Sequence, residues 1–174
     1  MLTEDGKHLY VSYDEYNNLI EKLAIKIHQS GWEFDTILCL ARGGMRPGDV
    51  LSRIFDKPLP SISTSSYRSQ GGTVQGHLDI ARYITTPQGD IAGRVLLVDD
   101  LADSGHTLSA VMDLLKNNYA PITELRSAVI WTKGVSGFTP DFSVEYLPTN
   151  PWIHQPFEAY DTMRPLQLLE KWRV

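Results

Sequence analysis

The feature that most constrains the fold of this chain is a pair of short, uninterrupted apolar runs. Residues 36–40 have the sequence TILCL and residues 95–98 have the sequence VLLV. A strand with one solvated face alternates apolar and polar side chains, so these runs indicate strands that are buried on both faces, as in a parallel sheet. Further strand candidates lie at 59–66, 80–85, 125–132 and 142–146.

Helical patterns lie between these strands. Ser12 and Glu15 form a capping box, and the apolar residues behind it recur at the spacing of one helix face, which predicts a helix over 13–29. Pro47 can open a second helix, and an apolar stripe at 108–119 marks a third. Alternating strands and helices predict an α/β fold with a largely parallel twisted sheet flanked by helices.

Composition places the chain among compact proteins with a substantial core. Its 174 residues, 42% of them hydrophobic, predict a single domain over 1–174. The formal net charge of −5 argues against nonspecific nucleic-acid binding, and no apolar run is long enough to span a membrane. Cys39 is the only cysteine and the N-terminus lacks the pattern of a secretion signal, so a cytoplasmic location is expected.

Several residues are interpreted as structural. Cys39 lies inside an apolar strand, and packing is the simplest role for three tryptophans, Trp32, Trp131 and Trp172. Residues 165–172 fit a short helix that covers either a sheet edge or a partner. The histidines are scattered without ligand spacing, so no zinc site is predicted; they are His8, His28, His77, His106 and His154.

A long polar segment, residues 67–77, follows the strand candidate at 59–66. Its sequence, YRSQGGTVQGH, contains three glycines and little that could join a core. Loops of this length inside a compact domain are typically functional lids or disordered segments. We therefore expect a mobile lid here.

The strand candidate at 95–98 ends in two carboxylates, Asp99 and Asp100, and continues as LADSGHT into a helix. Ligands of open α/β sheets bind at the carboxyl ends of the strands. A glycine turn that opens a helix presents backbone N–H groups to an anion, and Ser104 and Thr107 add hydroxyl donors, so this loop can cradle a phosphate. The acids require a cation or sugar hydroxyls nearby, and a phosphosugar with a metal supplies both. When such a loop occurs without other signals around it, it is more often a solvated turn.

The succession of strand, two acids, two further residues and Asp-Ser-Gly-x-Thr resembles the signature of the type I phosphoribosyltransferases. Ser104 stands where that family usually has Thr, and the change keeps the hydroxyl. The resemblance implies that Asp99 and Asp100 contact the ribose hydroxyls and the Mg²⁺ of bound phosphoribosyl pyrophosphate. It also implies a loop that binds this substrate and its 5′-phosphate, formed by Asp103, Ser104, Gly105, His106 and Thr107.

A second loop, Ala41-Arg42-Gly43-Gly44, follows the first buried strand. Glycine pairs are usually simple turns, but a diphosphate needs close backbone approach, and an arginine fork supplies paired donors to its oxygens. The resemblance identifies this segment with the pyrophosphate loop, in which Arg42 binds the leaving group while Gly43 and Gly44 shape the backbone. It also implies a cis peptide bond between Ala41 and Arg42.

Three further segments resemble the purine branch, especially the xanthine-guanine phosphoribosyltransferases. Lys133 ends a strand, where its ammonium can donate to a purine 6-oxo group. Trp152 and Ile153 begin the segment WIHQPFE, which implies a small C-terminal hood in which the tryptophan stacks on the base and nearby backbone reads its 2-position. Phe157 stands where this branch often has a second Trp. The lid opens with Ser65, Ser66 and Tyr67.

The implied reaction transfers 5-phosphoribosyl from phosphoribosyl pyrophosphate to guanine, xanthine or hypoxanthine, releasing pyrophosphate and forming a nucleoside monophosphate for purine salvage. Asp103 is the candidate general base, and Mg²⁺ and Arg42 stabilise the developing negative charge. A homo-oligomer, either a dimer or a tetramer, is expected. The alternative is a noncatalytic regulator that binds phosphoribosyl pyrophosphate or a nucleotide. A signalling receiver domain is rejected, because its acidic pair ends the first strand.

Overall fold

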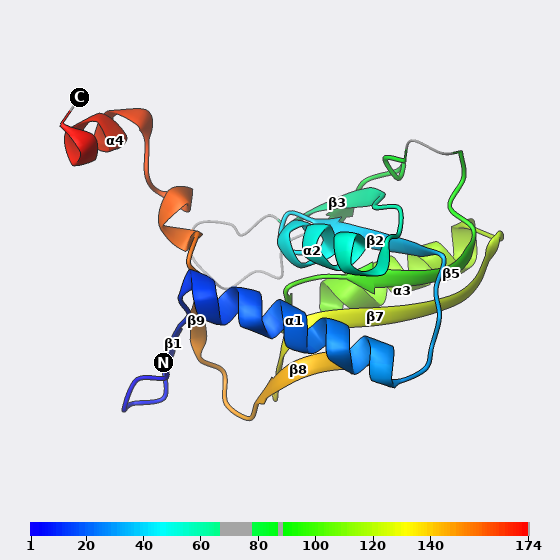
Figure 1. Ribbon diagram of the computed structural model, residues 1–174, viewed down its shortest axis with the longest axis horizontal. Helices are drawn as coiled ribbons and strands as arrows, with labels where there is room; N and C mark the ends of the chain where they lie inside the picture. Colours follow the sequence, from blue (N-terminus) through cyan, green and yellow to red (C-terminus); the bar gives the residue numbers. More distant parts are fainter. Residues whose placement is uncertain (67–77, 87–88, 174) are drawn as a thin grey trace.

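In a computed structural model that describes residues 1–66, 78–86 and 89–173, the chain forms a mostly parallel sheet with helices on both faces (Figure 1). This is the predicted fold class. The segment predicted to be a lid, 67–77, lies outside the described residues. No helix in the described part of the chain is long and apolar enough to span a membrane.

The strand order of the main sheet is β4-β3-β2-β5-β7, and β8 pairs with the other side of β7. Among the strands described for this sheet, only β4 is antiparallel to its neighbour. Short β6 pairs with β7 beyond the end of β5, in the same register, so it continues the line of β5. The strands are β2 (Thr36–Ala41), β3 (Ser61–Ser66), β4 (Leu78–Ile80), β5 (Gly93–Val98), β6 (Leu101–Ala102), β7 (Ile122–Lys133) and β8 (Phe142–Leu147).

Both faces of β5, the central strand, are buried, as its apolar run predicts. Leu96 and Val98 join a core with α1 (Tyr13–Gln29) and α2 (Met45–Phe55), whereas Val95 and Leu97 join a second core with α3 (His106–Asn118). None of these four side chains is exposed to solvent. A strand buried on both faces has a strongly specified register, because a shift by one residue would exchange the side chains of the two cores.

Helix α1 begins where the capping box predicts. The Glu15 N–H donates to Ser12 Oγ at 3.2 Å, and the Ser12 N–H donates to Glu15 Oε2 at 2.7 Å. Helix α2 begins at Met45, two residues before the predicted opening at Pro47. Proline is tolerated there because the N–H groups of a first helical turn have no partner within the helix.

Two parts of the sheet prediction need correction. The strand predicted over 80–85 ends at Ile80, and beyond it only an isolated bridge joins Thr85 to Ser61. The chain also contains a two-stranded parallel sheet, formed by β1 (His8–Tyr10) and β9 (Trp152–His154), which the patterns did not indicate. After β9 come a short 3₁₀ helix, η1 (Glu158–Asp161), and the C-terminal helix α4 (Pro165–Trp172).

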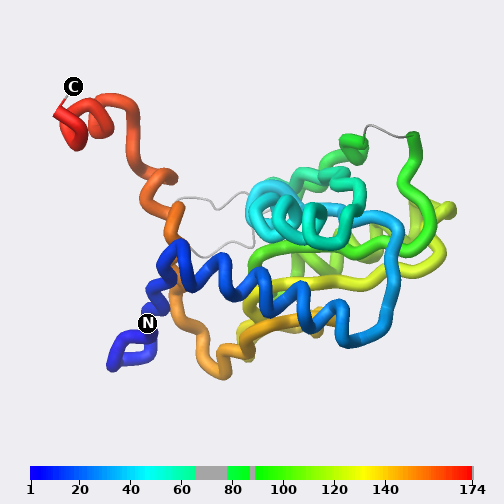
Figure 2. The backbone as a smooth tube through the Cα atoms, in the orientation of Figure 1, coloured from blue at the N-terminus to red at the C-terminus, as the bar shows by residue number. Residues whose placement is uncertain are grey.

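Helix α4 has the predicted bounds but extends away from the body of the molecule (Figure 2). None of its residues is buried. Trp172 is 69% exposed, so it does not pack within the described chain, and of the two roles predicted for this helix the structure contradicts the covering of a sheet edge. The structural interpretation of Cys39, Trp32 and Trp131 is confirmed, because all three are buried.

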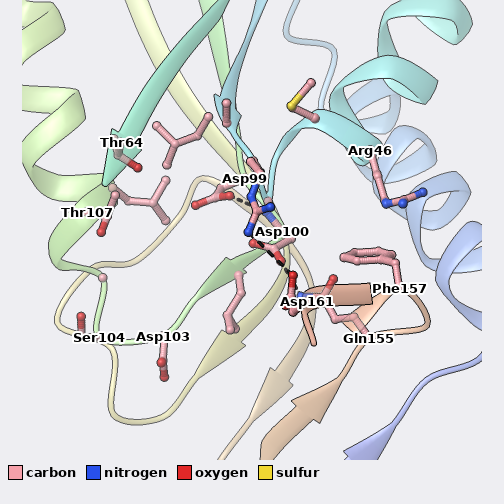
Figure 3. Close-up of a pocket in the computed structure, with 18 of the residues that line it drawn as sticks. Arg46, Thr64, Asp99, Asp100, Asp103, Ser104, Thr107, Gln155, Phe157 and Asp161 are labelled. Atoms are coloured by element: carbon pink, nitrogen blue, oxygen red, sulfur yellow. Dashed lines mark hydrogen bonds and ion pairs between the residues drawn. The ribbon is translucent and has the colours of Figure 1, made fainter. Parts of the chain in front are cut away.

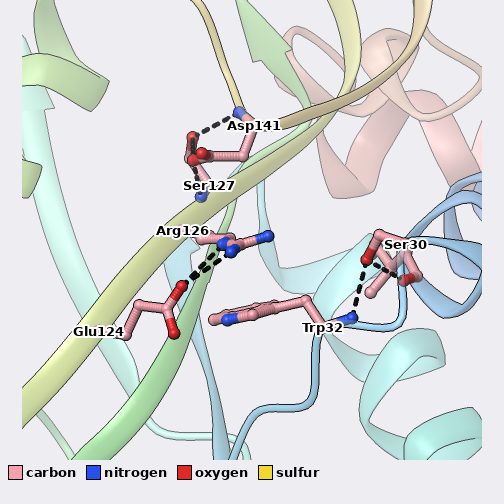
Figure 4. A network of polar contacts seen from close by, with 7 residues as sticks. Ser30, Trp32, Glu124, Arg126, Ser127 and Asp141 are labelled. Carbon is pink, nitrogen blue, oxygen red and sulfur yellow. Dashed lines mark hydrogen bonds and ion pairs between the residues drawn. The ribbon is translucent and has the colours of Figure 1, made fainter.

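A polar network lies around the first half of β7 and the segments that precede β2 and β8 (Figure 4). The N–H and hydroxyl of Ser127 donate to Asp141 Oδ2 at 2.8 and 3.0 Å. The Arg126 guanidinium lies 4.7 Å from the centroid of the Trp32 ring and 2.9 Å from Glu124 Oε1. These contacts tie β7 to the start of β8 and to the segment before β2, so they support the sheet.

We expect Ser12→Ala to lower the free energy of unfolding by about 1 kcal/mol, because it leaves the Glu15 N–H without its capping acceptor. Urea denaturation measures this value. Ser12→Thr, which retains a capping hydroxyl, is the matched control and should lose much less. Equal losses in the two variants would contradict a stabilising role for the cap.

Candidate active site

The carboxyl ends of β2 and β5 and the start of α3 surround a cavity of about 820 Å³ (Figure 3). This volume lies in the range of small-molecule sites. Most residues predicted to bind phosphoribosyl pyrophosphate line it: Arg42, Gly43, Asp99, Asp100, Asp103, Ser104, Gly105 and Thr107. Gly44 and His106 are the two predicted residues that do not contribute to its lining.

The acidic pair lies where β5 passes into β6. The Asp100 carbonyl oxygen accepts the N–H groups of Ile130 and Trp131, at 3.0 and 3.2 Å, so the backbone here remains joined to β7. The Asp100 N–H donates to Asp99 Oδ1 at 2.9 Å. Burial, followed by the negative charge of Asp100, raises the pKa of the Asp99 carboxyl well above its ordinary value. The pair can therefore hold a proton or bind a cation.

The glycine loop packs directly against this pair. The peptide bond between Ala41 and Arg42 is cis, as the resemblance implied. A Cβ on Gly43 would lie 2.8 Å from Asp99 Oδ1, and a Cβ on Gly44 would lie 2.9 Å from the Leu40 carbonyl oxygen and against that of Val98. Glycine is needed at both positions because of this close approach, and Gly44 shapes the loop from behind the cavity.

The loop predicted to bind the 5′-phosphate turns into α3 at Gly105, which has a left-handed φ of +79°. The His106 N–H donates to Ser104 Oγ at 3.3 Å, and the Gly137 N–H donates to the Ser104 carbonyl oxygen at 2.9 Å. The loop is thus preformed and supported from the segment after β7. The side chain of His106 is exposed and does not line the larger cavity.

A smaller cavity of about 180 Å³ adjoins the first and contains the residues predicted to bind the base, Lys133, Trp152 and Ile153. The Lys133 side chain is only 6% exposed, so it is not a surface lysine. Its Nζ donates to Asn150 Oδ1 at 2.9 Å and lies 3.0 Å from Asp103 Oδ1. Asp103 lines both cavities and therefore stands at their boundary.

Two side chains of the C-terminal segment reach into the larger cavity, and the sequence analysis missed both. Gln155 Nε2 donates to Asp100 Oδ2 at 2.5 Å, and Asp161 Oδ1 lies 3.7 Å from Arg42 Nη2. Arg46 and Thr64 also line the cavity. Arg46, in the first turn of α2, carried a usable signal as a second arginine directly after the glycine loop.

The residues predicted to open the lid are only partly described. Ser65 lies in β3, is exposed and does not line the larger cavity. Ser66 ends β3, and Tyr67 lies outside the described residues. The described residues therefore supply one wall from β3, at Thr64.

The carboxylates define what kind of cation this site could hold. Within the described ranges, no three or more His, Cys, Asp and Glu side chains are grouped as a metal site. Mg²⁺ is usually bound through one or two carboxylates together with waters and substrate phosphates. Asp99 and Asp100 fit that mode, because a cation would stabilise the ionised form of the buried Asp99.

Comparisons with known proteins agree with this geometry. The chain matches the family described as phosphoribosyl transferase domain over residues 12–162. It is 27% identical over 174 residues to the xanthine-guanine phosphoribosyltransferase of Ruegeria sp. (strain TM1040), covering 96% of this chain and 92% of the relative.

Two solved structures have the same fold. The purine phosphoribosyltransferase from Pyrococcus horikoshii Ot3 has a TM-score of 0.73 and 29% sequence identity, and the match covers 91% of this chain and 99% of that one. The Helicobacter pylori xanthine-guanine-hypoxanthine phosphoribosyltransferase has a TM-score of 0.71 and 25% identity, covering 94% and 99% of the two chains.

We expect Asp99→Asn to make the free energy of unfolding of the ligand-free chain depend less on pH. The raised pKa of Asp99 means that the folded state holds a proton that the unfolded state releases above about 3.8, so stability is lost as the pH rises towards the raised pKa. Asparagine does not ionise. Between about pH 5 and 8, the free energy of unfolding from urea denaturation should fall less in the variant than in the wild type.

The matched control is Asp113→Asn, which changes an exposed carboxylate on α3. It should follow the wild-type pH dependence. If Asp99→Asn followed the wild-type curve as closely as this control, the carboxyl of Asp99 would not be the buried proton-binding group.

Proposed function

Because this chain belongs to the phosphoribosyl transferase domain family, we propose that it transfers 5-phosphoribosyl from phosphoribosyl pyrophosphate to an oxopurine. Pyrophosphate and a purine nucleoside monophosphate are the products, and purine salvage is the role. The observation that carries the proposal is the pair of adjoining cavities. One is lined by residues suited to bind phosphate and sugar, and the other contains Lys133 and Trp152. The names of the relatives, which include purine, xanthine-guanine and xanthine-guanine-hypoxanthine phosphoribosyltransferases, support this substrate class.

In this proposal the two loops divide the substrate between them. Backbone N–H groups at 104–107, aided by the hydroxyls of Ser104 and Thr107, bind the 5′-phosphate at the start of α3. Arg42 binds the pyrophosphate and stabilises the negative charge that develops as it leaves. Its guanidinium is exposed and pairs with Asp161 at 3.7 Å, an ion pair that a phosphate can replace at little cost.

Asp99 and Asp100 would bind the ribose hydroxyls and hold Mg²⁺ with the substrate. When bound, Mg²⁺ supplies positive charge that neutralises the pyrophosphate oxygens. The need for such a cation follows from the cavity itself, whose lining includes four aspartates: Asp99, Asp100, Asp103 and Asp161. A bare polyphosphate would be repelled by them.

Asp103 and Lys133 would act on the base. The purine ring nitrogen attacks C1 of the ribose as the bond to pyrophosphate breaks, and the carboxylate of Asp103 accepts the proton of that ring. Lys133 has three donors, and Asp103 and Asn150 engage two of them, so one remains for the 6-oxo oxygen of the purine. Trp152 would stack on the ring, with the backbone at Ile153 reading its 2-position.

The wider setting is also part of the proposal. Cys39 is the only cysteine, which suits a reducing compartment such as the cytoplasm. A homo-oligomer is proposed because α4 leaves Leu166, Leu169 and Trp172 exposed, and burying them would require a further surface.

We expect phosphoribosyl pyrophosphate with Mg²⁺ to bind the wild type and to lose at least about tenfold in affinity in Arg42→Ala and in Asp99→Asn/Asp100→Asn. Arg42→Ala removes a positive charge that binds the phosphates, and Asp99→Asn/Asp100→Asn removes the negative charges that bind the cation and the sugar hydroxyls. Titration calorimetry measures the dissociation constants. Arg53→Ala, which removes an exposed arginine of α2 that pairs with Asp49, should bind like the wild type. Unchanged binding in the first two variants would show that the site is misplaced.

We expect adenine to be the worst purine substrate, because its 6-amino group leaves the Lys133 donor unpaired in a buried site, at a cost of about 1–3 kcal/mol. Lys133→Met should lower kcat/KM for guanine or hypoxanthine and narrow the gap to adenine, whereas Trp152→Ala should weaken all purines alike. A pyrophosphate-release assay with each base measures these values. The control is Lys116→Met, on the exposed side of α3.

Wild-type turnover of adenine above that of every oxopurine would contradict the assignment of Lys133. Tight binding of phosphoribosyl pyrophosphate without turnover of any base would instead favour the noncatalytic regulator.

A further inference from the structure

The first strand of the chain is joined to the strand that carries the proposed base platform. In the parallel pair β1–β9, His8 lies opposite Trp152 and Tyr10 lies opposite His154. The Trp152 N–H donates to the Lys7 carbonyl oxygen at 2.7 Å. The family match begins at residue 12, so β1 lies outside the part of the chain that the family accounts for.

Side chains of these two strands and Glu158 of η1 form one continuous hydrogen-bonded row that ends on the indole of Trp152. His8 Nδ1 lies 2.9 Å from His154 Nε2, and His154 Nδ1 lies 2.9 Å from Glu158 Oε2. The other carboxylate oxygen, Glu158 Oε1, accepts the Trp152 Nε1–H at 2.6 Å. Glu158 is thus shared between the histidine row and the tryptophan.

Ring stacking holds the middle of this row in place. The Tyr10 and His154 rings are 4.2 Å apart between centroids and nearly parallel, at 7°. The His8 and His154 rings are stacked at 5.1 Å. His154 is therefore fixed by two side chains of β1 and by Glu158 of η1.

The proton positions along the row follow from chemistry. A carboxylate only accepts, so His154 must carry a proton on Nδ1 to bond Glu158. The second nitrogen of His154 then either accepts from His8 or, in a charged ring, donates to it, and one proton lies between the two rings in both cases. Without His8, a neutral His154 is free to move its proton to Nε2, which would break the contact with Glu158.

We propose that His8, His154 and Glu158 are positioning residues that orient the indole of Trp152 at the smaller cavity, so that β1 is a working part of the base site. This inference rests on the proposed function, because it assumes that the purine base stacks on Trp152. Trp152 is 48% exposed, so burial alone restrains its ring only partly, and a ring that stacks on a ligand must be held at a defined angle. The row holds the indole at its polar edge, through the bond from Trp152 Nε1–H to Glu158.

The kinetic test separates base binding from the rest of the reaction. His8→Ala should raise KM for the oxopurine about 3–10-fold, the effect of one lost hydrogen bond, while kcat and KM for phosphoribosyl pyrophosphate stay within about twofold. His8→Asn, whose side-chain amide can replace Nδ1 as donor or acceptor, should restore KM. The control is His28→Ala, an exposed histidine in the last turn of α1, which should leave all constants unchanged.

A double-mutant cycle tests whether the effect passes through the tryptophan. Trp152→Phe keeps an aromatic ring but has no N–H to bond Glu158, so adding His8→Ala to it should cause no further rise in KM. Additive effects of the two substitutions would overturn the proposal, as would a His8→Ala variant that behaves like His28→Ala.

A spectroscopic test measures the mobility of the Trp152 indole independently of catalysis. In a Trp172→Phe background, Trp152 is the exposed tryptophan, because Trp32 and Trp131 are buried. Time-resolved fluorescence anisotropy should show a larger fast component with His8→Ala than with His28→Ala, which reports a loosened indole. An unchanged decay would overturn the positioning role even if the enzyme is active. Failure of the wild type to use any oxopurine, with a changed decay, would overturn the proposed function alone.

Discussion

The parallel ladder that joins β2, β5 and β7 is the constraint on which the rest of the structure depends. Because these strands run in the same direction, their carboxyl ends meet at one edge, where the glycine loop, the acidic pair and Lys133 come together. The fully buried side chains of β5 alternate between two cores, which fixes the register. The geometry of the site is therefore stabilised mainly by apolar burial in the strands beneath it, and the loops are free to carry charged groups.

The charged groups of the site hold one another in the ligand-free chain, but not with equal strength. Lys133 is nearly buried and Asp103 is half exposed, so their 3.0 Å contact is less screened by water than a pair exposed on both sides. The Arg42–Asp161 pair is 3.7 Å long and exposed on both sides, and such pairs contribute little. A phosphate ligand can thus replace Asp161 on Arg42 easily, whereas Lys133 keeps Asp103 in place between the two cavities. Under the proposed function, this difference separates a loop that exchanges Asp161 for a phosphate from a base site whose charged groups are already in place.

Sequence patterns predicted the elements whose signals are local. The capping box of Ser12, the apolar run at 95–98 and the turn at Gly105 each depend on residues within one short segment. The β1–β9 pair escaped prediction because each strand has three residues, too few for a periodicity, and they come from opposite ends of the chain. For the same reason, the spacing of the histidines, from which no zinc site was predicted, did not reveal that the fold brings His8 Nδ1 and His154 Nε2 to 2.9 Å. Gln155 and Asp161 act through tertiary contacts that no spacing encodes.

Phe157, which stands where the purine branch often has Trp, shows how the C-terminal segment is attached to the body. The Arg46 guanidinium lies 4.1 Å from the centroid of its ring, and the Tyr16 ring meets it edge-on at 5.4 Å between centroids. The Tyr16 hydroxyl is buried without a hydrogen-bond partner among the described residues, and burial raises its pKa far above the ordinary value. At Phe157 itself the contacts are ring packing and a cation–π contact, which tolerate small changes of angle better than hydrogen bonds do. Arg46 lines the larger cavity and Phe157 lines both cavities, so this contact joins the start of α2 to the C-terminal segment at the place where the two cavities meet.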